Sequence, residues 1–512
     1  MVSAVLFITF FVLLVLNVPI SICLGLSSAA AILYSGTSLT IVATNIYSGI
    51  SKFLLLAIPF FVLSGNIMAK AGISTRLIRF VDTCVGHRKG GIANVCIIVA
   101  CFFGAISGSG PATVAALGAV LIPAMVERGG FSAPFSTALM ATASSIAIVI
   151  PPSIAFVVYA SITGVSIGDM FMAGIVPGIL MGLALIVVVM LEVRKNHVVP
   201  SNVQKASAKE RLDAFKDAFW GFLMPVIILG GIYGGIFTPT EAAAVSVVYG
   251  LFVGMVIYKE VKLKDLWDIL IDSAKTTGGI MLIVACASLF SFVCTRFGIS
   301  AAASQLLAKV AGNQFTFLLI CNVIFLIAGC FIDANSAMYI FIPIMLPVCK
   351  QLGYNVIAFG IMATVNLAIG QVTPPVGVNL FVAIGVKLKN GLQVTLQQIS
   401  RAVVPMVAAC IVVLLMITYI PGISTFLPAA LGSAAAVENG TTTGGDSGTT
   451  ATDNDDFNTI EDYSDLDWPE MTWNFTCSTT ETSTWAQAGR KFGELMEQAT
   501  GGKIKVEVYA AD

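Results

Sequence analysis

The sequence of 512 residues is 57% hydrophobic and only 11% charged, whereas soluble domains have roughly a quarter of their residues charged. Many apolar runs reach the ~20 residues that a helix needs to cross a bilayer. This composition excludes one large soluble core and predicts an all-α polytopic membrane protein. The run from Met1 to Leu16 lacks a basic region and a small-residue cleavage site, so we interpret it as a first span and not as a signal peptide.

The predicted elements of the first half, residues 1–200, alternate apolar runs with breaks at proline and glycine. In chain order they are spans at 3–17 and 20–35, a loop, a long apolar segment at 50–80, a helical hairpin at 92–126, a helix at 132–160 broken at Pro151-Pro152, and a span at 171–193.

The second half, residues 201–427, repeats this order. Its predicted elements are spans at 218–237 and 240–258, a long segment at 266–297, a hairpin at 313–349, a helix at 355–386 broken at Pro374-Pro375, and a span at 400–427. If both hairpins are re-entrant, each half crosses the bilayer five times. An odd number of crossings makes the second half an inverted repeat of the first.

Basic residues support this topology. With the linker Arg194–Lys216 in the cytoplasm, eighteen Lys and Arg residues lie on the cytoplasmic side and at most four on the outer side, as the positive-inside rule requires. We expect the cytoplasmic clusters to orient the protein and to contact lipid head groups. Residue 427 then lies outside the membrane.

The C-terminal segment differs in charge from the rest of the chain. Residues 438–512 contain 15 acidic and 4 basic residues, a net charge of −11, against +10 for the preceding residues. We expect a flexible acidic linker at 428–470. We expect the truncated start of an extracytoplasmic α/β domain at 471–512, with strands at 472–478 and 503–509 and a helix at 482–500.

Both hairpins have tips that interrupt an apolar run. The first tip is Ser107-Gly108-Ser109-Gly110 and the second is Asp333-Ala334-Asn335-Ser336. Small residues of this kind also let membrane helices pack closely. Their recurrence at matching positions of two repeats favours a binding site instead, because non-helical backbone at membrane depth survives only in protein or beside a wet cavity.

The paired prolines predict a second feature of the site. Because proline has no N–H, Pro151 and Pro152 should free the carbonyls of Ala147 and Ile148, and Pro374 and Pro375 those of Gly370 and Gln371. The alternative is that the prolines only kink a span. Polar side chains beside the breaks are Ser144, Ser145, Asn366, Thr373 and Asn379, and hard oxygen ligands of this kind suit an alkali cation.

Two carboxylates lie at membrane depth. Asp333 could ligate a cation or fix its turn by accepting backbone N–H groups. Glu241 follows Thr238 and Pro239 in a capping-box pattern, so we favour a structural cap for it. Since proton coupling ordinarily uses chains of Asp, Glu or His, and no His lies mid-span, composition favours sodium coupling.

The sequence contains no motif that indicates a metal centre or an enzyme active site. Ten of the eleven cysteines lie in apolar runs, no CxxC spacing occurs, and the histidines are His87 and His197 alone. HExxH, GxSxG and paired carboxylates are also missing from the sequence. We therefore predict no enzyme, no zinc or redox site and no cofactor.

Residues 1–427 resemble the large membrane subunit of tripartite ATP-independent periplasmic (TRAP) transporters. The resemblance is carried by the segments Gly235–Val245 and Ser107–Thr113 and by both proline pairs. Segments Phe492–Leu495 and Thr500–Val506 resemble the start of that family's substrate-binding protein, here fused to the membrane subunit. The resemblance implies an elevator-type ion-transporter fold in a bacterial inner membrane, with a periplasmic C-terminal segment, and sodium-coupled uptake of an organic acid.

The resemblance also implies partners: a small four-helix membrane subunit and the binding protein, with no nucleic acid. From the tips and breaks together we predict two overlapping sets of site residues. Substrate is predicted to contact Ser107, Gly108, Ser109, Gly110, Pro152, Asn335, Ser336 and Asn379. Sodium is predicted to contact Ser107, Ser144, Ser145, Asp333, Asn366, Thr373, Pro374 and Gly377.

Other functional readings stay open at this point. One is a proton-coupled carboxylate transporter of the same architecture. Another is a channel or receptor with an external sensory domain, although paired re-entrant hairpins favour alternating access over a continuous pore. The transported acid is not identified by the sequence.

Overall fold

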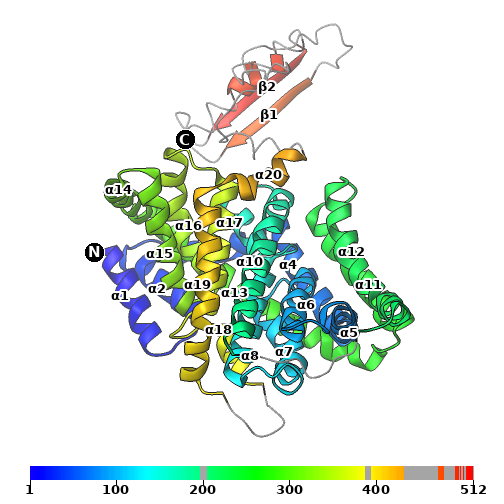
Figure 1. Cartoon of the computed structure of the whole chain (residues 1–512). Helices are drawn as coiled ribbons and strands as arrows, with labels where there is room; N and C mark the ends of the chain where they lie inside the picture. Colours follow the sequence, from blue (N-terminus) through cyan, green and yellow to red (C-terminus); the bar gives the residue numbers. More distant parts are fainter. Residues whose placement is uncertain are drawn as a thin grey trace, which may run out of the picture. The chain divides into compact units, whose positions relative to one another are not determined.

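The computed structural model describes residues 1–196, 205–386, 394–431, 471–477, 490–494, 496–497, 500 and 503–510. The chain forms two compact units, 1–440 and 441–512, and each is described here by itself. Within the described residues of the first unit all regular structure is helical (Figure 1). Eight of these helices are long and apolar enough to cross a membrane, so the prediction of an all-α polytopic fold is confirmed.

The first repeat contains helices α1 to α10. Their bounds are α1 Val2–Val15, α2 Ile20–Tyr34, α3 Thr40–Ile50, the 3-10 helix η1 Phe53–Leu56, α4 Ala57–Lys70, α5 Ile73–Val85, α6 Gly91–Ser107, α7 Gly110–Glu127, α8 Ala133–Ser145, the 3-10 helix η2 Ile146–Ile148, α9 Ile154–Thr163 and α10 Ile167–Lys195.

The second repeat contains α11 to α20. Their bounds are α11 Ala208–Tyr233, α12 Pro239–Phe252, the π-helix η3 Val253–Ile257, α13 Leu263–Arg296, α14 Ile299–Ala311, α15 Gln314–Phe331, α16 Ala334–Gln351, α17 Val356–Gly370, α18 Val378–Ile384, α19 Leu396–Tyr419 and α20 Gly422–Ala430.

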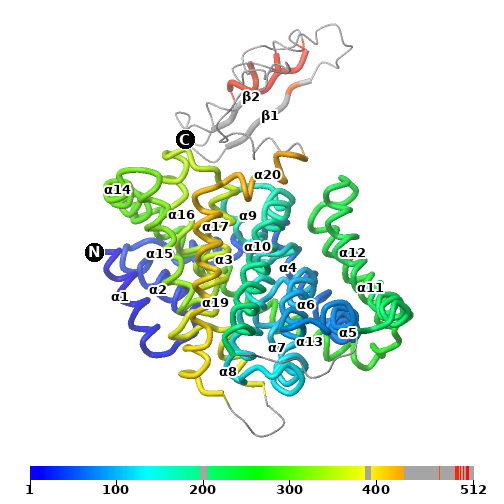
Figure 2. The backbone as a smooth tube through the Cα atoms, in the orientation of Figure 1, coloured from blue at the N-terminus to red at the C-terminus, as the bar shows by residue number. Residues whose placement is uncertain are grey.

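The two hairpins and the two broken helices form where the breaker residues predict them. Hairpin 1 is α6 and α7, and hairpin 2 is α15 and α16. The first broken helix is α8 and η2 followed by α9, and the second is α17 followed by α18. The same order of hairpin, broken helix and long final helix (α10, α19) occurs in both halves of the chain, which Figure 2 traces from blue to red.

The structure corrects three smaller expectations. The loop before Lys52 contains a helix, α3. The long segment at 50–80 is divided into α4 and α5, because Gly72 adopts a left-handed conformation with φ +69°, which glycine adopts without strain. The final span at 400–427 ends at Tyr419, and α20 follows Pro421 as a separate short helix. Helix α14 was not predicted.

Helices α4, with 14 residues, and α13, with 34 residues, pack against each other and are called the two arms below. Helix α4 packs on α12, on α13 and on α6 of hairpin 1, while α13 packs on α2, α3 and α16. A hydrogen bond joins the two arms, because the Asn66 amide Nδ2 donates to Ser273 Oγ at 2.8 Å. Both arms therefore lie beside the hairpins, and α4 directly contacts hairpin 1.

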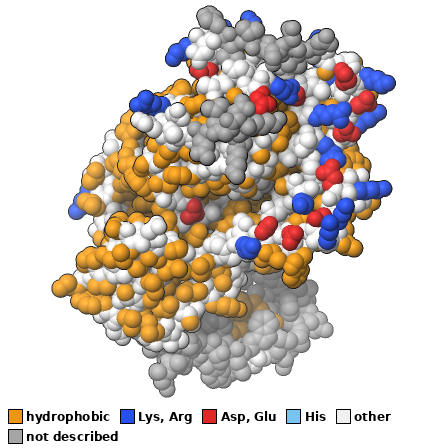
Figure 3. Space-filling view, turned by 90° about the horizontal axis from the view of Figure 1, so that it is seen from below, with side chains coloured by type: hydrophobic (Ala, Val, Ile, Leu, Met, Phe, Trp, Pro, Cys, Tyr) orange, Lys and Arg blue, Asp and Glu red, His pale blue; other side chains and the backbone are white. Residues whose placement is uncertain are grey.

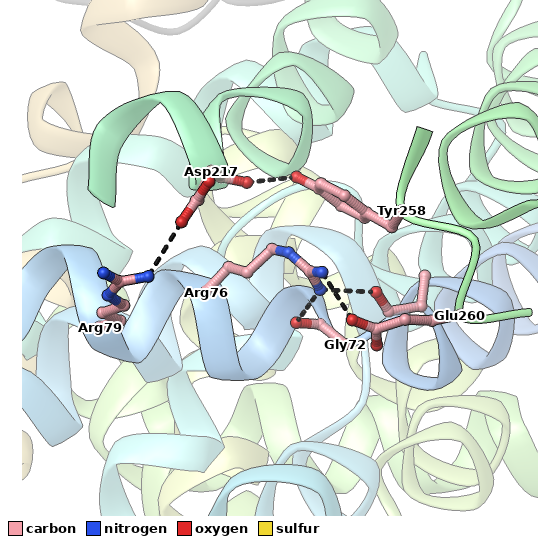
Figure 4. Close-up of polar contacts among 7 residues, drawn as sticks. Gly72, Arg76, Arg79, Asp217, Tyr258 and Glu260 are labelled. Carbon is pink, nitrogen blue, oxygen red and sulfur yellow. Dashed lines mark hydrogen bonds and ion pairs between the residues drawn. The ribbon is translucent and has the colours of Figure 1, made fainter. Parts of the chain in front are cut away.

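Charged side chains gather along one side of the face shown in Figure 3, while hydrophobic side chains cover much of the remainder. Part of the predicted basic cluster is paired within the protein and joins the two repeats (Figure 4). Arg76 on α5 lies 2.6 Å from Glu260 and 3.9 Å from the centroid of the Tyr258 ring. Arg79 lies 3.0 Å from Asp217 on α11.

Tyr258 completes this cluster. Burial raises the pKa of its hydroxyl, so the group stays protonated and donates to the Asp217 carbonyl at 2.6 Å. Exposed ion pairs contribute at most ~1 kcal/mol each. The cluster therefore fixes the position of α5 against α11 more than it adds stability.

The capping box predicted for Glu241 is present. Glu241 N donates to Thr238 Oγ1 at 3.3 Å, Thr238 N donates to the Glu241 carboxylate at 2.8 Å, and Pro239 occupies the first helical position of α12. The carboxylate thus satisfies a backbone donor at the start of α12 that the helix itself leaves unpaired.

In the second unit, β1 Met471–Cys477 and β2 Ile504–Ala510 pair in parallel, with Met471 opposite Ile504. Residues 490–494 between them are helical. Both predicted strands are confirmed to within a residue. The predicted linker from residue 432 onward and most of the predicted helix at 482–500 lie outside the described residues.

Candidate functional site

The tip of hairpin 1 is a two-residue turn. Helix α6 ends at Ser107, the next residue Gly108 has a φ of +60° in the left-handed region, and α7 begins at Gly110. The hydroxyls hold the turn: Thr113 Oγ1 donates to the Ser109 carbonyl at 2.8 Å, and Ser107 Oγ lies 2.9 Å from Thr113 Oγ1. The N–H groups at the start of α7 therefore point out of a fixed tip.

This tip lies against the first helix break. A methyl group built on Gly108 would lie 2.9 Å from the Pro152 carbonyl oxygen. One turn earlier, a methyl group on Gly104 would lie 2.7 Å from the Ala147 Cα. Glycine is required at both positions, because a side chain would force hairpin 1 away from the break.

The tip of hairpin 2 is built differently. Asp333 caps α16, since its Oδ2 accepts from Asn335 N at 3.0 Å and from Ser336 N at 3.1 Å. Its Oδ1 accepts from the Ser336 hydroxyl at 2.5 Å. Of the two roles expected for Asp333, the structure therefore contains the turn-forming one; cation ligation stays a prediction.

Hairpin 2 packs against the second break in the same way as hairpin 1 against the first. A methyl group built on Gly370 would lie 2.5 Å from the Gly329 Cα. Gly377, with a φ of +60°, donates its N–H to the Cys330 carbonyl at 3.3 Å. In each half of the chain, a glycine of the hairpin (Gly104 or Gly329) therefore packs directly on the broken helix.

The prediction that the paired prolines leave four carbonyls free is wrong for three of them. Ser153 Oγ donates to the Ile148 carbonyl at 2.6 Å. Asn379 N donates to the Gln371 carbonyl at 3.1 Å, and Thr373 N donates to the Gly370 carbonyl at 3.0 Å. Ser153 follows the first proline pair, and Thr373 and Asn379 lie before and after the second. These donors replace the missing N–H groups, so the breaks present side chains more than bare carbonyls.

The two repeats meet at the tip of hairpin 1. A methyl group built on Gly110 would lie 2.8 Å from Asn379 Nδ2 and 3.0 Å from Gln371 Oε1. Asn379 is fully buried and Gln371 is 6% exposed. Asn379 Oδ1, Asn379 Nδ2 and Gln371 Oε1 all lack a hydrogen-bond partner within the described part of the chain.

Unpartnered buried amides of this kind are rare in folded proteins, because each costs ~1–3 kcal/mol. Here two of them face the N-terminus of an 18-residue helix, α7. Helix N-termini attract anions, and carboxamide oxygens can bind a cation. Gln371 was missed as a site residue by the sequence reasoning, although a polar residue just before Pro374-Pro375 in an apolar run was a usable signal.

The other predicted cation ligands surround these breaks. Asn366 Nδ2 donates to the carbonyl and to Oδ1 of Asn322, while Asn366 Oδ1 is buried and has no partner in the described part of the chain. Ser144 and Ser145 donate to carbonyls of their own helix at 2.7 and 2.8 Å, as does Thr373 at 2.7 Å. Each of these hydroxyl oxygens keeps a lone pair that could bind a cation.

The remaining predicted substrate residues, Asn335 and Ser336, lie at the tip of hairpin 2. Asn335 Oδ1 is also buried and has no hydrogen-bond partner among the residues that the structure describes, whereas Ser336 is hydrogen-bonded to Asp333. Contacts therefore join the tip of hairpin 1 to Pro152, Asn379 and Gln371, while the polar contacts of hairpin 2's tip are made within the tip itself.

A cavity of about 120 Å³ lies between the tip of hairpin 1 and both arms. Ser107 and Ser109 of the tip line one wall, and Asn66 of α4 and Thr276 of α13 line another. Gly65 lets the arm approach, since a methyl group there would lie 3.3 Å from the Ser107 Cα. A wider groove of about 400 Å³ between α6, α10 and α11 has an apolar lining.

Comparison with known proteins agrees with this architecture. The family model for the DctM component of the tripartite ATP-independent periplasmic transporter matches residues 7–423. The isethionate TRAP transporter permease protein DctMQ of Oleidesulfovibrio alaskensis is 42% identical over 423 residues, 82% of this chain and 66% of that protein. The C4-dicarboxylate large permease protein DctM of Pseudomonas aeruginosa is 42% identical over 412 residues, 80% of this chain and 94% of that protein.

More distant similarities extend the comparison. The sialic acid TRAP large permease protein SiaM of Vibrio cholerae is 34% identical over 400 residues, 78% of this chain and 92% of that protein. The crystal structure of the YdaH transporter of Alcanivorax borkumensis aligns with a TM-score of 0.53 at 14% identity, over 76% of this chain and 88% of that one. That alignment shows a shared fold.

Proposed function

Because the chain belongs to the DctM family, the large membrane component of TRAP transporters, we propose that it performs secondary active uptake of an organic acid across a bacterial inner membrane. The observation that carries the proposal is the meeting of the two repeats, where unpartnered amides of Asn379 and Gln371 face the hairpin at Gly110. Relatives named for isethionate, C4-dicarboxylates and sialic acid support an organic anion as substrate.

Sodium is the proposed coupling ion. The buried acceptors without a partner at the breaks, Asn379 Oδ1, Gln371 Oε1 and Asn366 Oδ1, are neutral oxygens that suit a hard monovalent cation. Proton coupling would call for a chain of titratable groups. Among the described residues of these breaks and tips, Asp333 supplies the carboxylate, and this carboxylate already accepts from three donors.

The arrangement of arms and hairpins supports an elevator mechanism. The cavity has one wall on hairpin 1 and the other on arms α4 and α13, so movement of the hairpins past the arms would carry a bound solute and change its exposure. Gly65 has no side chain that would obstruct movement of Ser107 on hairpin 1 past α4.

The proposed partners are a small four-helix membrane subunit and a periplasmic binding protein that delivers the acid. Residues 471–512 would belong to that binding protein, fused to the membrane subunit. The parallel pairing of β1 and β2 around helical residues supports an α/β domain of this kind.

Transport in proteoliposomes tests the proposal. The full chain is reconstituted with the small subunit and the binding protein, and uptake of radiolabelled small organic acids is measured with the internal and external pH clamped. We expect accumulation under an inward sodium gradient and none without sodium. Equal uptake in sodium-free buffer under a proton gradient would contradict sodium coupling, and counterflow failing altogether would contradict carrier transport.

A further inference from the structure

The groove between α6, α10 and α11 opens to the outside of the protein. Its volume is about 400 Å³, and no charged, amide or hydroxyl side chain lines it. Ile179 and Leu183 of α10, which line it, are each 52% exposed. Helices α10 and α11 are long and apolar enough to cross a membrane, so the groove faces the hydrocarbon of the bilayer.

The size of the groove suits a single hydrocarbon chain. From Ile97 to Ala105 the lining follows α6 for about 12 Å, at 1.5 Å per residue. One turn of a helix about 10 Å wide and 5.4 Å long occupies roughly 400 Å³, which is already the volume of the whole groove. A helix of a partner protein therefore does not fit along this length, whereas an extended acyl chain does.

Basic residues gather at one end of the groove, where α6 begins and α10 ends. These two helix ends are in contact, since a methyl group built on Gly90 would lie 3.0 Å from Val193 Cγ2. Two exposed basic residues directly precede Gly90 and two directly follow Val193: Arg88, Lys89, Arg194 and Lys195. Under the positive-inside rule this end of the groove lies on the cytoplasmic side.

These four charges differ from the other basic residues of the same side. Arg76, Arg79 and Arg128 each lie within 3.0 Å of a carboxylate oxygen. Among residues 1–196, 205–386 and 394–431, none of the four forms an ion pair. Glu192, the nearest carboxylate along α10, accepts instead from the Asn196 amide. The end of the groove thus carries uncompensated positive charge, which attracts an anionic head group.

The depth of the groove matches the dimensions of a phospholipid. Ile186, which lines the groove, lies eight residues before Arg194, or about 12 Å along α10. The head-group layer of a bilayer extends roughly 5–8 Å beyond the hydrocarbon on each side. Because Lys and Arg side chains are long and flexible, an acyl chain in the groove places its head group within their reach.

We propose that an anionic phospholipid of the inner leaflet binds here, with one acyl chain in the groove and its phosphate at Arg88, Lys89, Arg194 and Lys195. Ile150 and Pro151 also line the groove, so the acyl chain contacts the first helix break. Binding of this lipid does not depend on the proposed transport activity.

Native mass spectrometry of the purified, delipidated full chain tests the proposal. The probes are dioleoyl phosphatidylglycerol and dioleoyl phosphatidylcholine, which have the same acyl chains but differ in head-group charge. We expect one molecule of phosphatidylglycerol to bind at least about tenfold more tightly than phosphatidylcholine. Equal binding of the two lipids, or binding of neither, would overturn the proposal.

Ile179→Trp tests the groove. The larger side chain fills it, and phosphatidylglycerol binding should weaken about tenfold or more, because the acyl chain loses several buried methylene groups. The control is Ile327→Trp on α15, since Ile327 is similarly exposed, at 57%, but does not line the groove.

Lys89→Gln combined with Lys195→Gln tests the charges at exposed positions, where folding is not at risk. Phosphatidylglycerol binding should weaken about tenfold, while phosphatidylcholine binding stays unchanged. The control is Lys259→Gln combined with Lys264→Gln, which removes two exposed charges outside the helices that line the groove.

Control variants that lose as much binding as the test variants would contradict a lipid site at this groove. Release of the lipid when the small membrane subunit is added would contradict it as well, because the groove would then be the docking surface of that protein. Lipid retained in the presence of the small subunit supports the proposal.

Discussion

Gly370→Ala is expected to abolish uptake and to lower the thermal stability of the purified protein. A methyl group at this position would lie 2.5 Å from Gly329 Cα and 2.6 Å from the Gly329 carbonyl carbon. Both are backbone atoms, so no side-chain movement can relieve the clash. Helices α15 and α17 must separate, and the adjacent hydrogen bond from Gly377 N to the Cys330 carbonyl is then lost.

The free-energy cost of the clash exceeds the gain in helix propensity, so a large loss of stability is expected. Overpacking a well-packed contact costs ~1–3 kcal/mol and sometimes more, while alanine gains at most about 1 kcal/mol over glycine in a helix. Gly278→Ala on α13 is the control, since a methyl group there meets no atom within 4 Å, and it should transport normally. Wild-type uptake by Gly370→Ala would show that hairpin 2 does not pack on the second break.

Asn379→Leu is expected to abolish uptake while keeping or raising stability. Asn379 is fully buried, and neither amide atom has a hydrogen-bond partner within the described residues. If its role were structural, this burial would be a net cost, because an unsatisfied amide is less favourable than an apolar side chain of similar size. Leucine removes that free-energy cost, and it also removes the amide group that would bind the cation or the substrate.

The combination of the two readouts is informative. Sodium-dependent uptake and the melting temperature are measured together on the same preparation. Asn94→Leu is the matched control: Asn94 is 4% exposed with an unpartnered Oδ1 but lies about 20 Å before the tip of hairpin 1 along α6. It should keep its activity. An Asn379→Leu protein that transports normally would place the site elsewhere.

Local breakers in an apolar sequence predicted the hairpins well. The glycine, serine and proline residues at 107–111 locate the first tip, because few other residues tolerate a left-handed turn followed at once by a new helix. The same reasoning located the turn at Asp333 and the cap at Glu241. These features depend on neighbours in sequence, which a single sequence shows directly.

Features that depend on tertiary contacts were harder to predict from the sequence. The contact of Gly110 with Asn379 joins the two repeats, and neither periodicity nor spacing indicates which parts of two repeats meet. The carbonyls beside the prolines were expected to be free, yet Ser153 and Asn379 supply donors from beyond each break. Gln371 is visible in the sequence as a polar residue before Pro374-Pro375, but its position beside Gly110 depends on a tertiary contact.

The contact between the repeats can be tested most directly by crosslinking in a cysteine-free background. Gly110→Cys is paired with Asn379→Cys, a protease site is inserted at 197–204, and oxidised samples are cleaved and separated by electrophoresis. The account predicts that the two halves stay joined until reductant is added. Gly110→Cys paired with Gly422→Cys should release them, because a methyl group on Gly422 meets no atom within 4 Å. Halves that separate equally in both pairs would contradict a shared site at the tip of hairpin 1.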